Sequence, residues 1–234
     1  MKIIISPSKT MKDRDYGFTI QDPEFKEQTD YLYHILQQYN DEELSSLMKI
    51  SSKQAQTVYE YYHTPSLKRP ALSFYQGMVF KQLELDHYSS HLDYLDKHLI
   101  ILSAYYGPLH YNTGIDFYRL DMTMKPHGIN LYEYWHTPVY QYFKDEDFII
   151  SLASKEFSDM VKHPHLYCID FIEIQGDKLK RQSTKVKKAR GMMLNQMILN
   201  EIKTLDQLKT LTVDGYYYSE DYSHDHSIAF IKYQ

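Results

Sequence analysis

The segment LYCIDFIEIQGDKLKRQSTKVKKARGMMLNQMILNEI, residues 166–202, decides the fold because it joins a strand pattern to a helix pattern. Leu166–Ile174 is an apolar run, which predicts a buried β-strand. After Gly191, apolar residues recur at helical spacing with Asn and Glu on the other side. This periodicity predicts an amphipathic helix over Met192–Lys203 that packs on a core. A protein built from such strands and helices around one sheet is α+β in class.

A basic run, KLKRQSTKVKKAR at Lys178–Arg190, separates the two patterns and gives a basic segment of about residues 178–191. It has seven basic and no acidic residues in thirteen positions, in a chain whose formal net charge is −5. The remaining chain carries 19 basic and 31 acidic side chains, a net charge of −12. Clustered Lys and Arg repel one another unless an anion relieves them, so the run indicates a phosphate-bearing partner. A solvated basic loop is the alternative.

The position of the run before a helix favours the anion site over the loop. Because the run leads directly into the predicted helix, we expect its side chains to be held at a helix start. Unpaired backbone N–H groups and the positive end of the helix dipole would add to anion binding there.

Composition places the chain among ordinary globular proteins. It has 234 residues, 43% hydrophobic and 24% charged, enough for a sizeable core. A single cysteine, Cys168, excludes a disulfide framework and fits a reducing compartment. The start MKIII is too short for the apolar part of a signal peptide, and no 18-residue apolar run occurs. We expect a soluble cytoplasmic protein.

Strand and helix patterns alternate along the chain. The predicted strands are Lys2–Ile5, Met78–Phe80, Leu99–Ser103, Phe148–Leu152, Leu166–Ile174, Gly215–Ser219 and Ser227–Ile231. The predicted helices are Pro23–Tyr39, a helix with Asp41 as its N-cap, Asp86–Lys97, Leu131–Phe143, Ser154–Val161, Met192–Lys203 and Leu205–Thr210. No repeat or linker divides them. We predict one α+β domain over residues 1–234, with a mixed β-sheet wrapped by helices.

The stretch LSSLMKISSKQA, within a segment of about residues 41–62, resembles a helix-hairpin-helix motif. Its apolar and small residues fall at the motif's spacing, but Lys49 and Ser51 stand where the motif has glycines. Glycine lets backbone N–H groups approach a DNA phosphate closely. Two packed helices joined by a short turn are therefore the alternative, although Lys49 and Lys53 could still contact phosphate.

Hydroxyl and charged residues follow several predicted strands, where ligand sites of α/β scaffolds tend to lie. Ser6–Thr10 follows the first strand, Ser103–Pro108 the strand at 99–103, and Ser154–Glu156 the strand at 148–152. Arg119 lies between Asp116 and Asp121. Each has a structural alternative, since strand exits need turn residues, Ser154 could cap a helix, and Arg119 could pair with a neighbouring acid.

Taken together and in order, these stretches resemble the motifs of the YaaA family of bacterial peroxide-stress proteins. The matching pieces are ISPSKT at 5–10, LMKISSKQA at 47–55, PAL with F.G.V at 70–79, LSAYYG at 102–107, YRLDM at 118–122, LYEYW at 131–135, LAS.E at 152–156, KKARGMM at 187–193 and GYYY at 215–218. The resemblance covers nearly the whole chain. One departure is His110-Tyr111, where the family often has Arg-Pro.

The resemblance implies an unusual α/β fold with a helix-hairpin-helix-like element, a positively charged cleft and DNA binding in the cytoplasm. It also implies a link to limiting free iron under peroxide. The sequence itself has only two short histidine pairs, 163/165 and 224/226, without a third ligand at a recognisable spacing. We therefore predict no metal site and no cofactor.

Two hypotheses follow, a binding protein and an enzyme. A DNA-binding protein would contact phosphates without sequence choice, and its affinity would fall steeply with salt. Its candidate residues are Lys9, Lys49, Lys53, Arg119, Lys185, Lys187, Lys188 and Arg190. An enzyme would hold a small phosphorylated or nucleotide-like substrate in the same basic cleft. Its proton chemistry would come from Ser6, Ser154 or Glu156.

Overall fold

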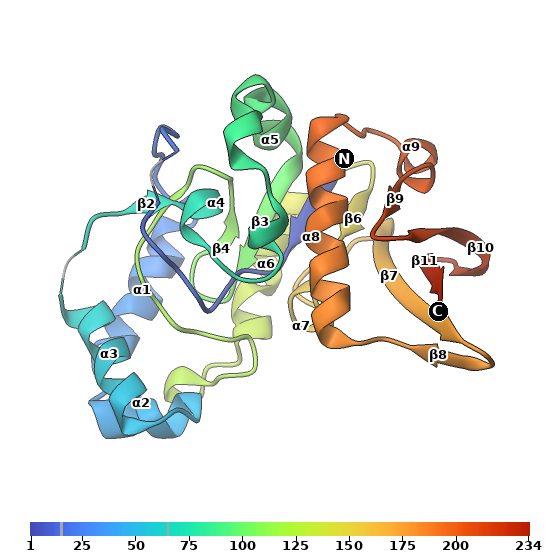
Figure 1. Cartoon of the computed structure of the whole chain (residues 1–234). Helices are drawn as coiled ribbons and strands as arrows, with labels where there is room; N and C mark the ends of the chain where they lie inside the picture. Colours follow the sequence, from blue (N-terminus) through green and yellow to red (C-terminus); the bar gives the residue numbers. More distant parts are fainter. Residues whose placement is uncertain (15, 65) are drawn as a thin grey trace.

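The structure is a computed structural model that describes residues 1–14, 16–64 and 66–234 (Figure 1). The strands are β1 (Lys2–Ile5), β2 (Arg69–Pro70), β3 (Leu99–Ser103), β4 (Gly107–Leu109), β5 (Gly114–Ile115), β6 (Ile149–Ser151), β7 (Leu166–Gln175), β8 (Lys178–Lys180), β9 (Thr212–Val213), β10 (Tyr216–His224) and β11 (Ser227–Tyr233). The helices are α1 (Lys26–Leu36), α2 (Asp41–Met48), α3 (Ser52–His63), α4 (Ala71–Phe74), α5 (Leu92–His98), α6 (Leu131–Phe143), α7 (Lys155–Ser158), α8 (Ser183–Leu199) and α9 (Leu205–Lys209). Short 3-10 helices span Phe80–Gln82, Leu85–Ser90 and Pro126–Gly128.

One mixed sheet organises the molecule, in the order β4-β3-β1-β6-β7-β11-β10-β9, with β8 paired to β7. The five strands β3, β1, β6, β7 and β11 are parallel, and the others join antiparallel. Parallel strands covered by other elements are apolar along their whole length. All five residues of β3 and the isoleucines of β1 are buried accordingly. The predicted mixed sheet with helices is confirmed.

Helix α8 crosses the molecule in front of the sheet in Figure 1, with β9, β10 and β11 on one side and the N-terminal helices on the other. It begins at Ser183, so the prediction of a helix starting at Met192 was wrong by nine residues. Lysine and arginine are good helix formers, and the buried Ala189 anchors the basic stretch to the core. Four of the seven basic residues therefore lie inside the helix, whereas Lys178, Lys180 and Arg181 precede it.

The predicted strand at Met78–Phe80 was also wrong, because this segment is a turn that leads into a 3-10 helix. Two glycines explain the tight packing of the turn. A Cβ at Gly77 would lie 2.5 Å from Ser8 Oγ, and a Cβ at Gly191 would lie 2.3 Å from the Val79 carbonyl oxygen. The segment is wedged between the loop after β1 and helix α8, which leaves it no neighbouring strand to pair with.

The helix-hairpin-helix-like segment forms two helices, α2 and α3, joined by a tight turn. Asn40, and not Asp41, is the N-cap of α2, and its side chain forms a capping box with Glu43. Lys49 takes the left-handed conformation, φ 50°, that favours glycine. The helical pair is thus present, whereas a DNA-binding role for it remains a prediction. No helix among the described residues is long and apolar enough to cross a membrane.

Candidate anion-binding site

A cavity of about 460 Å³ opens at the carboxyl ends of β1 and β6. Its wall comes from five parts of the chain: the loop after β1, the turn before the first 3-10 helix, residues 118–121, the segment after β6, and α8. The lining residues are Ser6, Pro7, Ser8, Lys9, Thr10, Gly77, Met78, Val79, Phe80, Tyr118, Arg119, Leu120, Asp121, Leu152, Ser154, Glu156, Phe157, Lys187 and Arg190.

The sheet topology explains why the cavity lies here. Strand β1 has β3 on one side and β6, the next parallel strand in the chain, on the other. The chain therefore reverses its direction across the sheet at β1. In open parallel sheets such a reversal leaves a crevice outside the carboxyl ends of the strands, and ligands bind there.

Two serines join the loops that leave these strands. Ser6 Oγ donates a hydrogen bond to Ser154 Oγ at 3.2 Å and accepts one from the Ser154 backbone N–H at 2.8 Å. Ser154 is at the N-cap position of α7, but its side chain makes no capping hydrogen bond. Ser154 also lines the cavity. The capping alternative is therefore confirmed for the position of Ser154, with Glu156 in the first turn, but not for a capping role of its side chain.

A group of charged side chains lies beside the serines. Lys9 Nζ pairs with Asp121 Oδ2 at 2.5 Å, and Glu156 Oε1 accepts a hydrogen bond from the Met122 N–H at 3.0 Å. Burial raises the pKa of the Glu156 carboxyl above its ordinary value, and the negative charge of Asp121 raises it further. The Met122 N–H and Lys9 oppose this shift. Glu156 therefore holds a proton to a higher pH than a solvated glutamate does.

The two arginines form a separate cationic region. The Nε atoms of Arg119 and Arg190 are both buried and have no hydrogen-bond partner among the described residues. Burial lowers the pKa of Arg190, which means that its surroundings disfavour an unpaired positive charge. Asp121 pairs with Lys9, so the alternative in which it neutralises Arg119 is not realised. Both arginines line the cavity, so an anion bound there would lie beside two positive charges.

Tyrosines fix the backbone that carries Arg119. Tyr62 of α3 donates a hydrogen bond from its hydroxyl to the Arg119 carbonyl at 3.0 Å and accepts one from the Arg119 N–H at 3.1 Å. Tyr118 meets Tyr75 at 2.6 Å between hydroxyl oxygens and accepts a hydrogen bond from Ser103 at 2.9 Å. The α2–α3 pair and the strand exit at Ser103 thus support the site without lining it.

The structure brings together seven of the eleven sequence-predicted site residues. These are Ser6, Lys9, Arg119, Ser154, Glu156, Lys187 and Arg190. Sequence reasoning did not assign Tyr118, Met78 or Gly77 to the site. The matching pieces YRLDM at 118–122 and PALSFYQGMV at 70–79 contain all three. The available signal was therefore their place in these family motifs and not their residue types.

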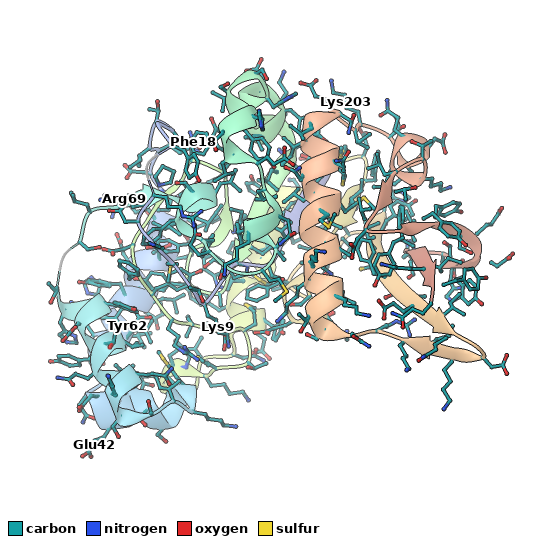
Figure 2. The ribbon with its side chains drawn as sticks, viewed as in Figure 1. Lys9, Phe18, Glu42, Tyr62, Arg69 and Lys203 are labelled. Atoms are coloured by element: carbon teal, nitrogen blue, oxygen red, sulfur yellow. The ribbon has the colours of Figure 1, made fainter. Side chains whose placement is uncertain are left out.

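Four predicted phosphate contacts lie outside the cavity. Lys185 pairs with buried Glu173 at 2.9 Å, and Lys188 contacts Asp214 at 3.3 Å, because both project from a different side of α8 than Lys187 and Arg190. Lys49 and Lys53 belong to the α2–α3 pair, at the lower left of Figure 1. Figure 2 shows Glu42 of α2 well away from Lys9. Lys185 and Lys188 do not line the cavity with Lys187 and Arg190, because helical periodicity divides the basic run. Phosphate contacts by Lys49 and Lys53 remain a prediction.

The arrangement can bind an anion and can exchange a proton with it. Two guanidinium groups and two ammonium groups offer donors to phosphate oxygens. Glu156 and the serine pair offer a proton acceptor and hydroxyl donors in the same cavity. Among the described residues, no group of three or more His, Cys, Asp or Glu is arranged to hold a metal ion.

A continuous mixed sheet with a cationic cavity at its carboxyl edge defines a mixed α/β protein with a candidate anion site. The family model for peroxide stress protein YaaA matches residues 1–222. The chain is similar to the UPF0246 protein of Finegoldia magna, with 38% identity over 244 positions that cover 99% of this chain and 98% of the relative. It is also similar to the UPF0246 proteins of Pediococcus pentosaceus, 36% identical over 99% of this chain and 98% of the relative, and of Fusobacterium nucleatum, 34% identical over 99% of both. The chain belongs to the YaaA family of peroxide stress proteins.

Proposed function

We propose that this protein acts in the peroxide stress response by binding DNA phosphates in the cavity at the carboxyl edge of β1 and β6. The observation that carries the proposal is that Arg119 and Arg190 line one cavity and that the buried Nε atom of each has no hydrogen-bond partner among the described residues. Charged donors in a low-dielectric site gain strongly from a bound anion, and phosphate is the anion whose geometry matches guanidinium. Lys187 on the exposed side of α8 adds a cation at the rim.

The proposed link to limiting free iron has a different basis. It rests on the resemblance to the YaaA family alone, since no iron ligand set is recognised among the described residues. A protein that covers DNA phosphates would displace the cations condensed on them, and this supports a connection between DNA binding and protection from metal-driven oxidation.

The test is fluorescence anisotropy of labelled single-stranded and duplex DNA with wild type, Lys187→Ala/Arg190→Ala and Lys188→Ala. Lys188 is the matched control, because it adjoins Lys187 and carries the same charge but contacts Asp214 outside the cavity. We expect the double variant to lose at least tenfold in affinity and Lys188→Ala to change it less than twofold. A loss of log affinity in Lys188→Ala of about half that of the double variant, one charge against two, would show that binding follows net charge and not the cavity.

An enzyme acting on a small phosphorylated substrate is the second candidate. It is favoured by one observation, a glutamate with a raised pKa close to the Ser6–Ser154 pair in the cationic cavity. A protein that only holds phosphate has little use for such a carboxyl group. Turnover of a phosphorylated substrate that is lost in Glu156→Gln, with ligand binding retained, would establish this candidate.

A further inference from the structure

The cavity has a third chemical region besides its cations and its carboxylates. Met78, Val79 and Phe80 contribute an apolar wall, and Leu120 and Phe157 extend it. Met78 is 38% exposed although its side chain is apolar. An apolar side chain at the rim of a charged cavity has no obvious role in holding a bare phosphate.

The cations and carboxylates do not neutralise one another as a single network. Among neighbouring charges, Asp121 and Lys9 shift the pKa of the Glu156 carboxyl group. The pKa of the Arg190 guanidinium is shifted instead by Asp170 and Cys168, which do not line the cavity. The cavity therefore presents an anion-binding part and a part that accepts hydrogen bonds. A ligand that fits both parts carries a negative charge and hydrogen-bond donors some distance apart.

We propose that the ligand is a nucleotide, with its phosphate at Arg119 and Arg190 and its base against the Met78–Phe80 wall. The sugar hydroxyls or the amino group of the base then meet Glu156. The volume of about 460 Å³ falls in the range of small-molecule pockets. Thioether and aromatic side chains suit the flat face of a base. This inference rests on the proposed function, because it names the ligand of the same phosphate site.

The nucleotide has two possible sources with the same chemistry, a free nucleoside monophosphate or the terminal nucleotide of a DNA strand. Calorimetry would compare inorganic phosphate, ribose 5-phosphate and the four nucleoside 5′-monophosphates. A linear single strand with a 5′-phosphate and a closed circular single strand, which has no end, would separate the two sources. If the linear strand binds more tightly than the circular one, the ligand is the terminal nucleotide of a DNA strand. If a nucleoside monophosphate binds more tightly than either strand, the ligand is the free nucleotide.

The decisive variant is Met78→Ala, with Leu179→Ala as its control. Leu179 is an exposed apolar residue on β8 that does not line the cavity. We expect Met78→Ala to weaken nucleotide binding about two- to tenfold, as the loss of a thioether–aromatic contact does, and to leave the binding of inorganic phosphate unchanged. Leu179→Ala should change neither. Met78 is partly exposed, so its truncation leaves the fold intact.

Two outcomes would overturn the inference in different ways. If inorganic phosphate binds as tightly as any nucleotide, the cavity is a phosphate site only, and the proposed function survives without the nucleotide. If neither phosphate nor any nucleotide nor any strand binds to wild type, the proposed function fails as well.

Discussion

Glu156 has surroundings that differ from those of a solvated glutamate. It is partly buried, close to Asp121 and Lys9, and bonded to the Met122 N–H. The balance of these effects keeps its proton bound at a pH where exposed carboxyl groups have lost theirs. The charge of the cavity therefore depends on pH through this group.

We predict that sulfate binding weakens as pH rises through the raised pKa of Glu156. Below that pKa the carboxyl group is neutral and the cations dominate, whereas above it a carboxylate repels the anion. Sulfate is the suitable probe because its own charge stays constant over this range. Calorimetric titrations at a series of pH values should show the decline in wild type and a flatter profile in Glu156→Gln. A profile of the same slope in both proteins would assign the pH dependence to another group.

At the scale of elements, helix α8 packs closely against the turn at Val79, and the contact is made at Gly191. Ala is normally better than Gly inside a helix by about 1 kcal/mol. Here the added Cβ would lie 2.3 Å from a backbone oxygen of Val79, which cannot move without shifting the turn that lines the cavity.

We predict that Gly191→Ala lowers the free energy of unfolding by about 1–3 kcal/mol, the usual range for overpacking. Urea unfolding followed by circular dichroism measures it. Thr184→Ala, an exposed substitution on the same helix, should leave stability unchanged or slightly higher. If Gly191→Ala instead raised the free energy of unfolding, the turn at Val79 would have to shift at little energetic cost.

Lys185 connects the same helix to β7. It pairs with Glu173, whose side chain is only 2% exposed and also accepts a hydrogen bond from the Tyr216 hydroxyl. Burial alone would raise the pKa of Glu173, but the Lys185 and Tyr216 hydrogen bonds outweigh it, and the pKa is lowered. A carboxyl group with a lowered folded-state pKa contributes stability above its unfolded pKa and loses it as pH falls through the folded value.

We predict that Lys185→Met lowers the free energy of unfolding at neutral pH by about 1–3 kcal/mol, because it leaves a buried carboxylate short of a partner. The difference from wild type should shrink as the pH falls and Glu173 takes up a proton. Denaturant midpoints at neutral and acidic pH test this, with Lys188→Met as the control on a more exposed pair. A pH-independent difference would point to lost packing of the lysine stem instead.

At the scale of the whole molecule, an acidic protein concentrates a few cations in one cavity. The net charge is −5 and the isoelectric point is about 6.2. Most of the surface therefore repels nucleic acid, in contrast to a DNA-binding protein that is basic over a whole face. Binding should depend on few phosphate contacts.

We predict a salt dependence less steep than the eight candidate cations together would give, with a slope of log K against log salt of about −2 to −4, as two to four phosphate contacts require. Anisotropy titrations over a salt series measure it, and Lys187→Ala/Arg190→Ala should bring the slope toward zero. A much steeper slope would indicate a large contact area outside the cavity, with Lys49 and Lys53 as its first candidates.

Particular residues show why sequence reasoning reached some features and missed others. Strand β3 and helix α6 were predicted with the bounds they have, because a run of apolar residues or a helical period is a local signal. The start of α8 was missed because a run of lysines carries no apolar period. The turn at Met78 was missed because an apolar triplet does not reveal what packs against its backbone.

The class of fold, the strand exits that line the cavity, and the family could all be predicted from the sequence alone. These depend on local pattern and on the order of motifs. Only the tertiary structure decided which cations act together. Lys187 and Lys188 are neighbours in the chain, yet one lines the cavity and the other pairs with Asp214, because successive residues of a helix project about 100° apart. Likewise, among the described residues Arg119 has no acidic partner, because Lys9, more than a hundred residues away, pairs with Asp121.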